Sequence, residues 1–166
     1  MKHAVIVSGG NINTDFALDF LKKNTDENTL LIAADRGLEF FERTGLVPDI
    51  AVGDFDSLSE SGKKFLETLS NTEIIRLRPE KDDSDTQSAA CLAMDRGMKR
   101  IMILGATGNR VDHLMANFGL LVLGRERGCE IILADPWNYM KLIESGTVLK
   151  RSEQFGKYVS FFSIGG

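Results

Sequence analysis

Short apolar runs of strand length alternate along the chain with longer amphipathic stretches of helical length. The apolar runs contain few polar residues, as in strands that helices cover on both faces. Alternation of strands and helices implies right-handed crossovers between parallel strands. The pattern therefore predicts a doubly wound, mainly parallel α/β sheet. Its six strands are expected at residues 3–7, 29–33, 50–52, 73–77, 100–104 and 130–134.

The stretches between these strands carry signals for the starts and ends of helices. Ser84, followed three residues later by Gln87, matches a capping box and predicts a helix over the apolar segment 89–94. Gly97 and Gly128 stand where a left-handed residue is expected after a helix. Further helices are predicted around residues 16–21, 38–41 and 58–69. In the last predicted helix, six apolar residues recur as one stripe: Val111, Leu114, Met115, Phe118, Leu121 and Val122.

The pattern changes after Pro136. Three segments there resemble antiparallel strands with glycines at the turns between them: residues 139–144, 147–150 and 157–164. Three strands make a poor core on their own. We therefore expect a Rossmann-like α/β domain over residues 1–136. Residues 137–166 are expected to be the beginning of a second, all-β domain that ends before it is complete.

Composition and charge exclude several classes of function. Of the 166 residues, 43% are hydrophobic and 27% are charged, as in an ordinary globular protein. No window approaches ~18 consecutive apolar residues, so we predict no membrane span. The net charge of −4 argues against a nucleic-acid partner, which requires a basic surface. Cys91 and Cys129 show no disulfide-like pattern, which favours a reducing cytoplasm.

Carboxylates follow four consecutive predicted strands. Open parallel sheets bind ligands at the edge where their strands end, so these side chains should share one site. Carboxylates that converge repel each other and raise each other's pKa unless a cation neutralises them. Mg²⁺ or Mn²⁺ suits such oxygen ligands, and the pattern therefore predicts a metal site. We assign six residues to this edge: Asp35, Asp54, Asp56, Asp82, Asp85 and Asp112. Without them the net charge of −4 would become +2.

The segment Gly53-Asp54-Phe55-Asp56-Ser57 is the sharpest local signal. Side chains alternate in an extended segment, so Asp54 and Asp56 would face the site while Phe55 anchors the turn in the core. The simpler alternative is a turn in which Asp56 or Ser57 caps the following helix. We favour metal binding for the two aspartates and capping for Ser57.

Other candidate residues have ordinary explanations beside the functional one. Asp112 lies in the first turn of a predicted helix, where the helix dipole alone stabilises a carboxylate. Ser84 and Gln87 are explained by the capping box, although Gln87 could also face a ligand. Asp83 is explained as a solvated loop residue.

Glycine-rich turns after the first and fifth predicted strands are candidates for phosphate binding. Gly9 and Gly10 lie in the first of these turns, and residues 105–110 form the second. Backbone N–H groups in such turns can approach phosphate oxygens. Lys81 and Arg110 could supply side-chain cations. Neither a Walker A motif nor G-x-G-x-x-G is present, so the glycines alone are weak evidence.

Taken together and in this order, four segments resemble the thiamine pyrophosphokinase (thiamine diphosphokinase) family. They are Ala34–Gly37 (ADRG), Gly53–Ser57 (GDFDS), Glu80–Gln87 (EKDDSDTQ) and Gly105–His113 (GATGNRVDH). The resemblance spans essentially the whole predicted α/β domain. It departs from the family pattern at Ser84, where threonine is common, and at Gly166, beyond which the family's second domain continues.

The resemblance implies an α/β catalytic domain that binds ATP and Mg²⁺, followed by a β-sandwich domain that binds thiamine. It implies transfer of a pyrophosphoryl group from ATP to the hydroxyl of thiamine, with AMP as the second product, in a cytoplasmic homodimer. The implied metal ligands are Asp54, Asp56, Asp82 and Asp85. The implied catalytic residues are Asp54, Asp56, Asp85 and Asp112. We assign ATP binding to Gly9, Gly10, Asp35, Lys81, Asp82, Gln87, Asn109 and Arg110.

Two points stay open at this stage. Either Asp85 or Asp112 could accept the proton of the attacking hydroxyl. The same carboxylates would also suit a non-catalytic domain that senses a magnesium nucleotide, or a diphosphokinase acting on another heterocyclic alcohol such as a pterin.

Overall fold

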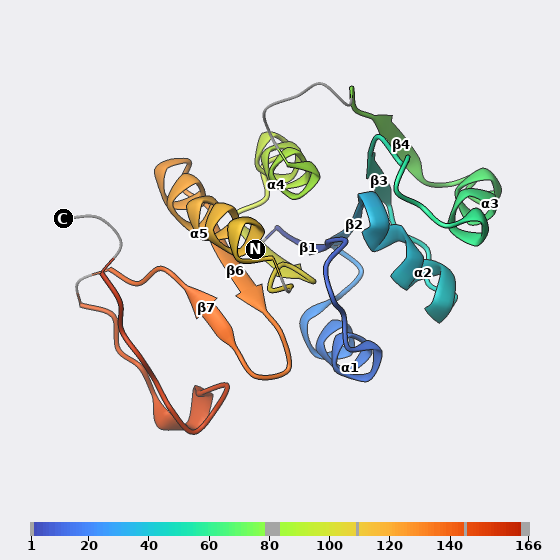
Figure 1. The fold of residues 1–166 in the computed structure, drawn as a ribbon. Coiled ribbons are helices and arrows are strands. Elements are labelled where there is room, and N and C mark those ends of the chain that lie inside the picture. The colour runs from blue at the N-terminus through green and yellow to red at the C-terminus, as the bar shows by residue number, and fades with distance from the viewer. Residues whose placement is uncertain (1, 79–83, 109, 145, 164–166) are drawn as a thin grey trace.

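The computed structural model describes residues 2–78, 84–108, 110–144 and 146–163. Seven strands form one sheet in the order β4-β3-β2-β1-β5-β6-β7 (Figure 1). Neighbours among the first six strands are parallel, and β7 is antiparallel to β6. The strands are β1 (His3–Val7), β2 (Thr29–Ala34), β3 (Ile50–Gly53), β4 (Glu73–Arg76), β5 (Arg100–Leu104), β6 (Glu130–Ala134) and β7 (Tyr139–Lys141).

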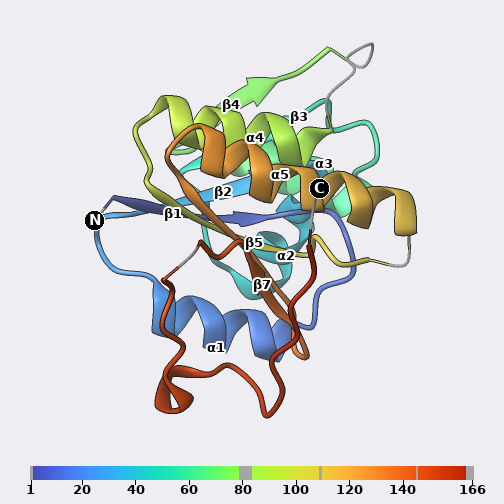
Figure 2. The same ribbon diagram turned by 90° about the vertical axis from the view of Figure 1, so that its left-hand side faces the viewer.

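Helices cover both faces of this sheet, as Figures 1 and 2 show: α4 and α5 lie on one face, and α1 and α2 on the other. The α-helices are α1 (Thr14–Asn24), α2 (Leu38–Thr44), α3 (Glu60–Thr68), α4 (Asp85–Asp95) and α5 (Val111–Glu126). Two 3₁₀ turns are η1 (Asp35–Gly37) and η2 (Arg151–Glu153). The predicted doubly wound, mainly parallel sheet is therefore confirmed.

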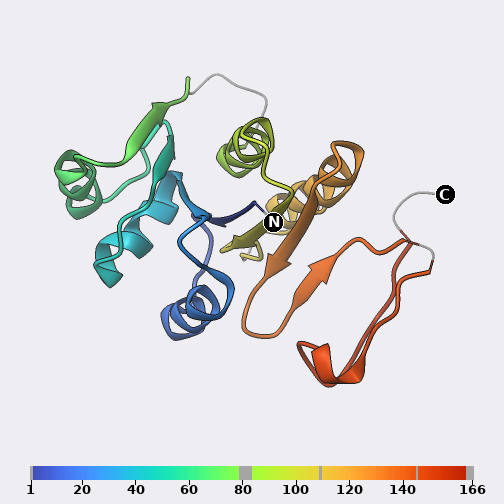
Figure 3. The same cartoon turned by 180° about the vertical axis from the view of Figure 1, so that it is seen from behind.

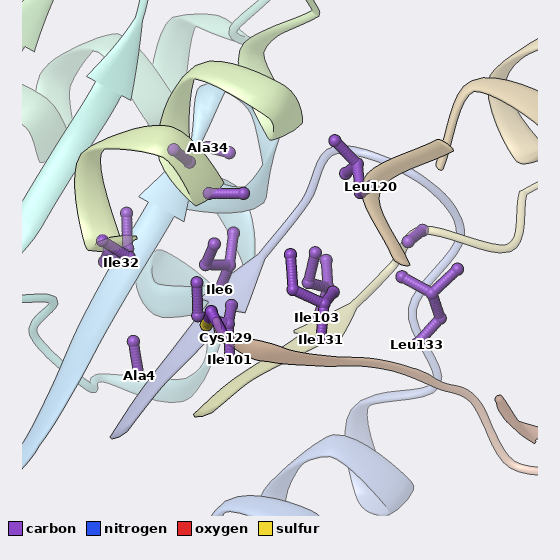
Figure 4. Close-up of a cluster of buried hydrophobic side chains, with 14 of the residues drawn as sticks. Ala4, Ile6, Ile32, Ala34, Ile101, Ile103, Leu120, Cys129, Ile131 and Leu133 are labelled. Carbon is purple, nitrogen blue, oxygen red and sulfur yellow. The ribbon is translucent and has the colours of Figure 1, made fainter. Parts of the chain in front are cut away.

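Alternate side chains of the strands build two cores. Ile6, Ile32 and Ile101 belong to the cluster that packs under α4 and α5, which Figure 4 shows in close-up. Val5, Val7 and neighbouring strand residues pack on the opposite face against α1, α2 and α3. The strands are apolar on both faces for this reason, which explains the continuous apolar runs in the sequence.

The predicted helix signals are confirmed in part. The Ser84 side chain accepts a hydrogen bond from the Gln87 backbone N–H at 3.2 Å, so Ser84 caps α4. Gly97 and Gly128 have φ of 81° and 66°, the left-handed conformation predicted after α4 and α5. The prediction that Ser57 caps the third helix is wrong. Ser59 caps α3 by accepting a hydrogen bond from the Gly62 N–H.

The predicted apolar stripe of α5 is only partly buried. Val111 and Met115, near the start of the helix, are 71% and 60% exposed. Burial begins at Asn117, whose side-chain amide donates a hydrogen bond to the Ala106 carbonyl oxygen at 2.8 Å. Leu120 and Leu121 then enter the core. The stripe prediction was wrong for the first turns because α5 packs on the sheet only from Asn117 onward.

The region after residue 136 differs from the three predicted strands. The described residues contain one strand there, β7, and it extends the α/β sheet beside β6 (Figure 3). The predicted strand 147–150, and the described part 157–163 of the last one, pair with no neighbour and are exposed. An apolar sequence forms a strand only where its backbone groups find a partner. The predicted β-sandwich is therefore not confirmed. Within the described ranges, no helix has the length and apolar character needed to cross a membrane.

Candidate active site

The register of the sheet brings the ends of neighbouring strands to one level. Val7, the last residue of β1, pairs with Ala33 in β2 and Leu104 in β5. The strand order reverses at β1: β2, β3 and β4 lie on one side of it, and β5 and β6 lie on the other. Ligands bind at such a switch point in open α/β sheets. The loops after β1, β2, β3 and β5 are therefore the loops from which a site would be built.

Asp35 occupies a constrained turn directly after β2. Its φ of 46° is left-handed, a conformation that costs a residue other than glycine about 1–3 kcal/mol. The Ser57 hydroxyl donates a hydrogen bond to Asp35 Oδ2 at 2.5 Å. Asp35 Oδ1 is buried and has no hydrogen-bond partner among the described residues. Such strain clusters at functional sites, and an orphaned buried oxygen calls for a ligand or an ion to contact.

The segment from Asp54 to Asp56 is a tight turn, and the predicted extended conformation is wrong. Phe55 has a φ of 63°. Its side chain is nevertheless buried, at 3% exposure, and the Arg76 guanidinium lies 5.5 Å from its ring centroid. The predicted anchoring of the turn by Phe55 is therefore confirmed. Its backbone is left-handed, however, and not extended as predicted. The turn leaves Asp54 half-buried and Asp56 exposed.

Asp54 and Asp56 influence each other's charge. The Asp56 backbone N–H donates a hydrogen bond to Asp54 Oδ1 at 3.2 Å. Side-chain hydrogen bonding with Asp54 raises the pKa of Asp56, and desolvation and the charges of Asp54 and Asp35 add to this effect. The three carboxylates that follow β2 and β3 are thus close enough to repel one another. A cation bound between them would relieve this repulsion.

The start of α4 is attached to the end of β1. The hydroxyls of Ser8 and Thr86 form a hydrogen bond of 2.6 Å, and both side chains are buried. Asp85 lies in the first turn of α4, where the helix dipole favours a carboxylate. Gln87 lies in the same turn, and its backbone N–H is used by the cap. The predicted site residues Lys81, Asp82 and Asn109 lie outside the described residues.

Asp112 forms an ion pair with Arg110. The Arg110 guanidinium donates to both carboxylate oxygens of Asp112, at 3.2 and 2.5 Å. This hydrogen bonding lowers the pKa of Asp112, and desolvation opposes the effect. Both side chains are exposed. A lowered pKa makes Asp112 a weaker proton acceptor while it is paired in this way.

The two glycine-rich turns lie against each other at the switch point. The Gly10 N–H donates to the Gly105 carbonyl oxygen at 3.1 Å. A Cβ on Gly10 would lie 2.1 Å from that same oxygen, so a larger residue would force the two turns apart. These glycines therefore allow a close approach of two backbones, which the sequence analysis did not predict, and the Gly10 N–H bonds to Gly105.

Two polar features were missed by the sequence reasoning. Asp135 follows β6 and accepts a hydrogen bond from the Thr107 hydroxyl at 2.6 Å, which ties the turn after β5 to the turn after β6. Burial would raise the pKa of Asp135, but hydrogen bonds from Thr107, Asn138 and the backbone outweigh it and lower the pKa. Asp135 could have been predicted from the sequence, because it directly follows a predicted strand. The contact between Ser57 and Asp35 had no such signal.

The donor set at the end of β2 and β3 suits a hard divalent cation. Asp35, Asp54 and Asp56 offer carboxylate oxygens, one of them buried and unpartnered. No group of three acidic, histidine or cysteine side chains is already arranged to hold a metal in the part of the chain that the structure describes. Mg²⁺ is usually bound by one or two carboxylates together with substrate phosphates, so the residues fit a magnesium ion that arrives with a phosphate ligand.

Replacing Ser57 by alanine tests whether this hydroxyl holds Asp35 in place. We expect Ser57→Ala to lower the free energy of unfolding by about 0.5–1.5 kcal/mol, because the hydrogen bond to Asp35 is lost. Ser57→Thr keeps the hydroxyl and should lose less. Urea unfolding of the two variants checks this, and equal losses in both would show that the hydroxyl is not the cause.

The chain is similar to proteins of one family. The family model for the catalytic domain of thiamin pyrophosphokinase matches residues 21–133. The thiamine pyrophosphokinase of Bacillus subtilis (strain 168) is 32% identical over 161 residues, which are 97% of this chain and 73% of that protein.

Solved structures agree with this match. The crystal structure of thiamine pyrophosphokinase from Bacillus subtilis superposes with a TM-score of 0.72 at 32% identity, over 84% of this chain and 63% of that one. The enzyme from Geobacillus thermodenitrificans gives 0.69 at 29% identity, over 84% and 62%. Yeast thiamin pyrophosphokinase gives 0.68 over 86% and 61%, and at 17% identity it supports the fold alone. The chain thus spans less than two thirds of the length of these structures.

Proposed function

The chain belongs to the thiamine pyrophosphokinase family, and we propose that it takes part in the transfer of a pyrophosphoryl group from ATP to the hydroxyl of thiamine, which yields thiamine diphosphate and AMP. The observation that carries this proposal is the convergence of Asp35, Asp54 and Asp56 at the ends of β2 and β3. ATP is the co-substrate that the family implies.

The proposed reaction needs positioning of the phosphates, neutralisation of their charge and removal of one proton. Asp54, Asp56 and Asp85, together with Asp82, would hold Mg²⁺, which would neutralise the charge of the triphosphate. Asp35 would hold the turn that carries Asp54 and Asp56 in place, because it accepts a hydrogen bond from Ser57 in that turn. Gly9, Gly10, Lys81, Gln87, Asn109 and Arg110 are the proposed contacts to ATP.

The hydroxyl of thiamine would attack the β-phosphorus, and its proton would pass to a carboxylate. Of the two candidates, Asp112 is held by Arg110 and has a lowered pKa, which makes it the weaker acceptor. We therefore favour Asp85, in the first turn of α4, as the proton acceptor. A loss of the acidic limb of the pH–rate profile, the fall in rate at low pH, in Asp112→Asn would contradict this choice.

The remaining assignments rest on family membership. We propose that residues 1–136 form the ATP- and magnesium-binding domain, since the family model matches residues within this range. Residues 137–166 would belong to the thiamine-binding β-sandwich domain. We also propose a cytoplasmic homodimer that has no nucleic-acid or membrane partner. Cys91 and Cys129, which form no disulfide, support the cytoplasm, and the net charge of −4 argues against nucleic acid.

The raised pKa of Asp56 predicts a pH-dependent effect of Mg²⁺ on stability. A carboxylate whose pKa is higher in the folded state adds stability below its unfolded pKa and loses that contribution as the pH rises through its folded pKa. Without metal, stability should therefore fall across this interval. Mg²⁺ should raise the thermal midpoint at pH 7 and have little effect at pH 3, where Asp56 is protonated.

Thermal unfolding with and without Mg²⁺ at the two pH values measures this effect. In Asp54→Asn the pKa of Asp56 should return toward its ordinary value, and the stabilisation by Mg²⁺ should largely disappear. An equal shift of the midpoint at both pH values, or an unchanged shift in the variant, would show that the ion binds elsewhere.

Two alternatives predict different products. A domain that only senses a magnesium nucleotide would bind ATP and release no AMP. A diphosphokinase for another heterocyclic alcohol would release AMP with, for example, a hydroxymethyl pterin and ignore thiamine. An AMP-release assay with ATP, Mg²⁺ and each alcohol separates the three. We expect AMP only with thiamine, and AMP with the pterin alone would overturn the proposal.

A further inference from the structure

A pair of buried hydroxyl groups joins the end of β1 to the first turn of α4. The hydroxyl oxygens of Ser8 and Thr86 lie 2.6 Å apart, and the two residues are 7% and 8% exposed. They are 78 positions apart in the sequence. A buried hydroxyl costs stability unless it forms a hydrogen bond, so each of these residues needs the other. Neither residue has a role in the proposed reaction so far.

Thr86 begins the face that α4 turns toward the sheet. The other buried residues of this face are Ala89, Ala90 and Ala93, which follow Thr86 by three, four and seven positions. Alanine side chains let a helix approach a sheet closely, but they form only low ridges to lock the helix against its neighbours. The hydroxyl pair adds a directional contact to this smooth surface. It does so at the end of α4 that carries Asp85.

Ser8 is itself held in a fixed place. Its backbone N–H donates a hydrogen bond to the Leu104 carbonyl oxygen of β5 at 2.8 Å. Gly37, in the turn that begins with Asp35, packs so closely that a Cβ there would lie 3.2 Å from the Ser8 carbonyl carbon. Ser8 is therefore fixed relative to β5 and to the turn after β2. Its hydroxyl gives the start of α4 a fixed position relative to both.

The charges at this edge of the sheet make such a contact important. Asp35, Asp54 and Asp56 follow β2 and β3, and they are close enough to influence each other's ionisation. Asp85 brings a further negative charge on a separate element, α4. Like charges repel, so without a bound cation the start of α4 is driven away from the sheet edge. The hydrogen bond of the neighbouring residue, Thr86, opposes this movement.

We propose that Ser8 and Thr86 are positioning residues, whose hydrogen bond holds the first turn of α4 at the edge of the sheet. Asp85 then contacts the same divalent cation as Asp54 and Asp56. The inference rests on the proposed function, which assigns these three carboxylates to the ion. Residues that orient metal ligands touch no metal themselves, yet the loss of one typically weakens metal binding about 10–100-fold.

Mn²⁺ binding to the full chain tests the proposal, with the free ion measured by electron paramagnetic resonance. Thr86→Val removes the hydroxyl and keeps the shape, and it should weaken Mn²⁺ binding about 10-fold or more. Thr86→Ser keeps a hydroxyl and should bind Mn²⁺ more nearly as the wild type does. When Ser8→Ala is combined with Thr86→Val, no hydroxyl is left unpaired, so stability in urea should recover. Mn²⁺ binding should stay weak in this double variant, because Asp85 is no longer held.

Two comparisons show whether the effect passes through Asp85. In Asp85→Asn, adding Thr86→Val should weaken Mn²⁺ binding no further, because residues that act through one another are not additive. Thr72→Val is the matched control, since the buried Thr72 hydroxyl donates to the Pro48 carbonyl oxygen at 2.7 Å. Thr72 directly precedes β4, at the edge where the strands begin. This variant should lose stability as Thr86→Val does and bind Mn²⁺ as the wild type does.

Wild-type Mn²⁺ affinity in the double variant would overturn the proposal, because the pair would then only satisfy two buried hydroxyls. A full further loss in the Asp85→Asn background, or an equal loss in Thr72→Val, would overturn it as well. A wild type that binds no Mn²⁺ would contradict the metal assignment on which it rests.

These outcomes are distinct from those of the proposed function. If the hydroxyl pair and Asp85 govern Mn²⁺ affinity while ATP and thiamine give no AMP, the positioning role stands and the proposed reaction fails. If the wild type forms AMP and the double variant matches it in both Mn²⁺ affinity and rate, the proposed reaction stands and the positioning role fails.

Discussion

Replacing Asp54 by asparagine is expected to reduce the rate of AMP release on the order of 10²–10³-fold, because one preorganised charge that offsets phosphate charge is removed. Asp54→Asn keeps the size of the side chain and its place in the turn after β3, where the Asp56 N–H donates to it. The steady-state rate with saturating ATP, Mg²⁺ and thiamine measures the effect. Asp56→Asn should behave in the same way, since the two carboxylates act on one another.

The control for this prediction is a carboxylate away from the site. Asp19 is exposed on α1, and Asp19→Asn should leave the rate unchanged. Asp54→Asn should remain folded without metal, because it relieves repulsion among Asp35, Asp54 and Asp56. Near wild-type turnover of either site variant would contradict the role assigned to these carboxylates.

Replacing Gly37 by alanine is expected to destabilise the fold by about 1–3 kcal/mol, because a side chain is forced into a closed space. A Cβ on Gly37 would lie 1.9 Å from the Val7 carbonyl oxygen and 2.6 Å from its carbon. Both are backbone atoms of β1, so no change of rotamer can relieve the contact. The turn that carries Asp35 and Arg36 would have to move, and activity should fall with stability.

Urea unfolding measures this loss, and Gly119→Ala in α5 is the matched control. A Cβ on Gly119 meets no atom within 4 Å, so alanine should stabilise the helix by about 0.5–1 kcal/mol. If Gly37→Ala were as stable as the wild type, the close packing of the ADRG turn against β1 would be disproved.

The parts of the fold that depend on local pattern could be predicted from the sequence. Continuous apolar runs identified β1, β2, β3, β5 and β6 because both faces of these strands are buried, whereas β4 lies at the edge of the sheet and is largely exposed. Ser84 was identified as a cap because its bond to the Gln87 N–H spans three residues. The convergence of Asp35, Asp54 and Asp56 followed from one topological rule, that parallel strands end at one edge.

The parts that depend on distant contacts could not be predicted. The hydrogen bond from Ser57 to Asp35 joins residues that are 22 positions apart, so no local pattern reveals it. The local pattern predicted a helix cap at Ser57 instead. Phe55 is left-handed with its ring buried beside Arg76, and no local pattern signals this turn. Val111 and Met115 follow the helical period, but the place where α5 meets the sheet decides their exposure. The apolar segments after β7 have strand-like composition and find no partner among the described residues.

The central claim is that the carboxylate edge supports transfer of a pyrophosphoryl group to thiamine. Phosphorus NMR of one reaction with ATP, Mg²⁺ and thiamine measures it most directly, because it identifies every phosphorus-containing product. We predict thiamine diphosphate and AMP in equal amounts, and formation of both on the order of 10²–10³-fold more slowly in Asp54→Asn. Formation of ADP with thiamine monophosphate, or AMP that appears equally without thiamine, would contradict the account.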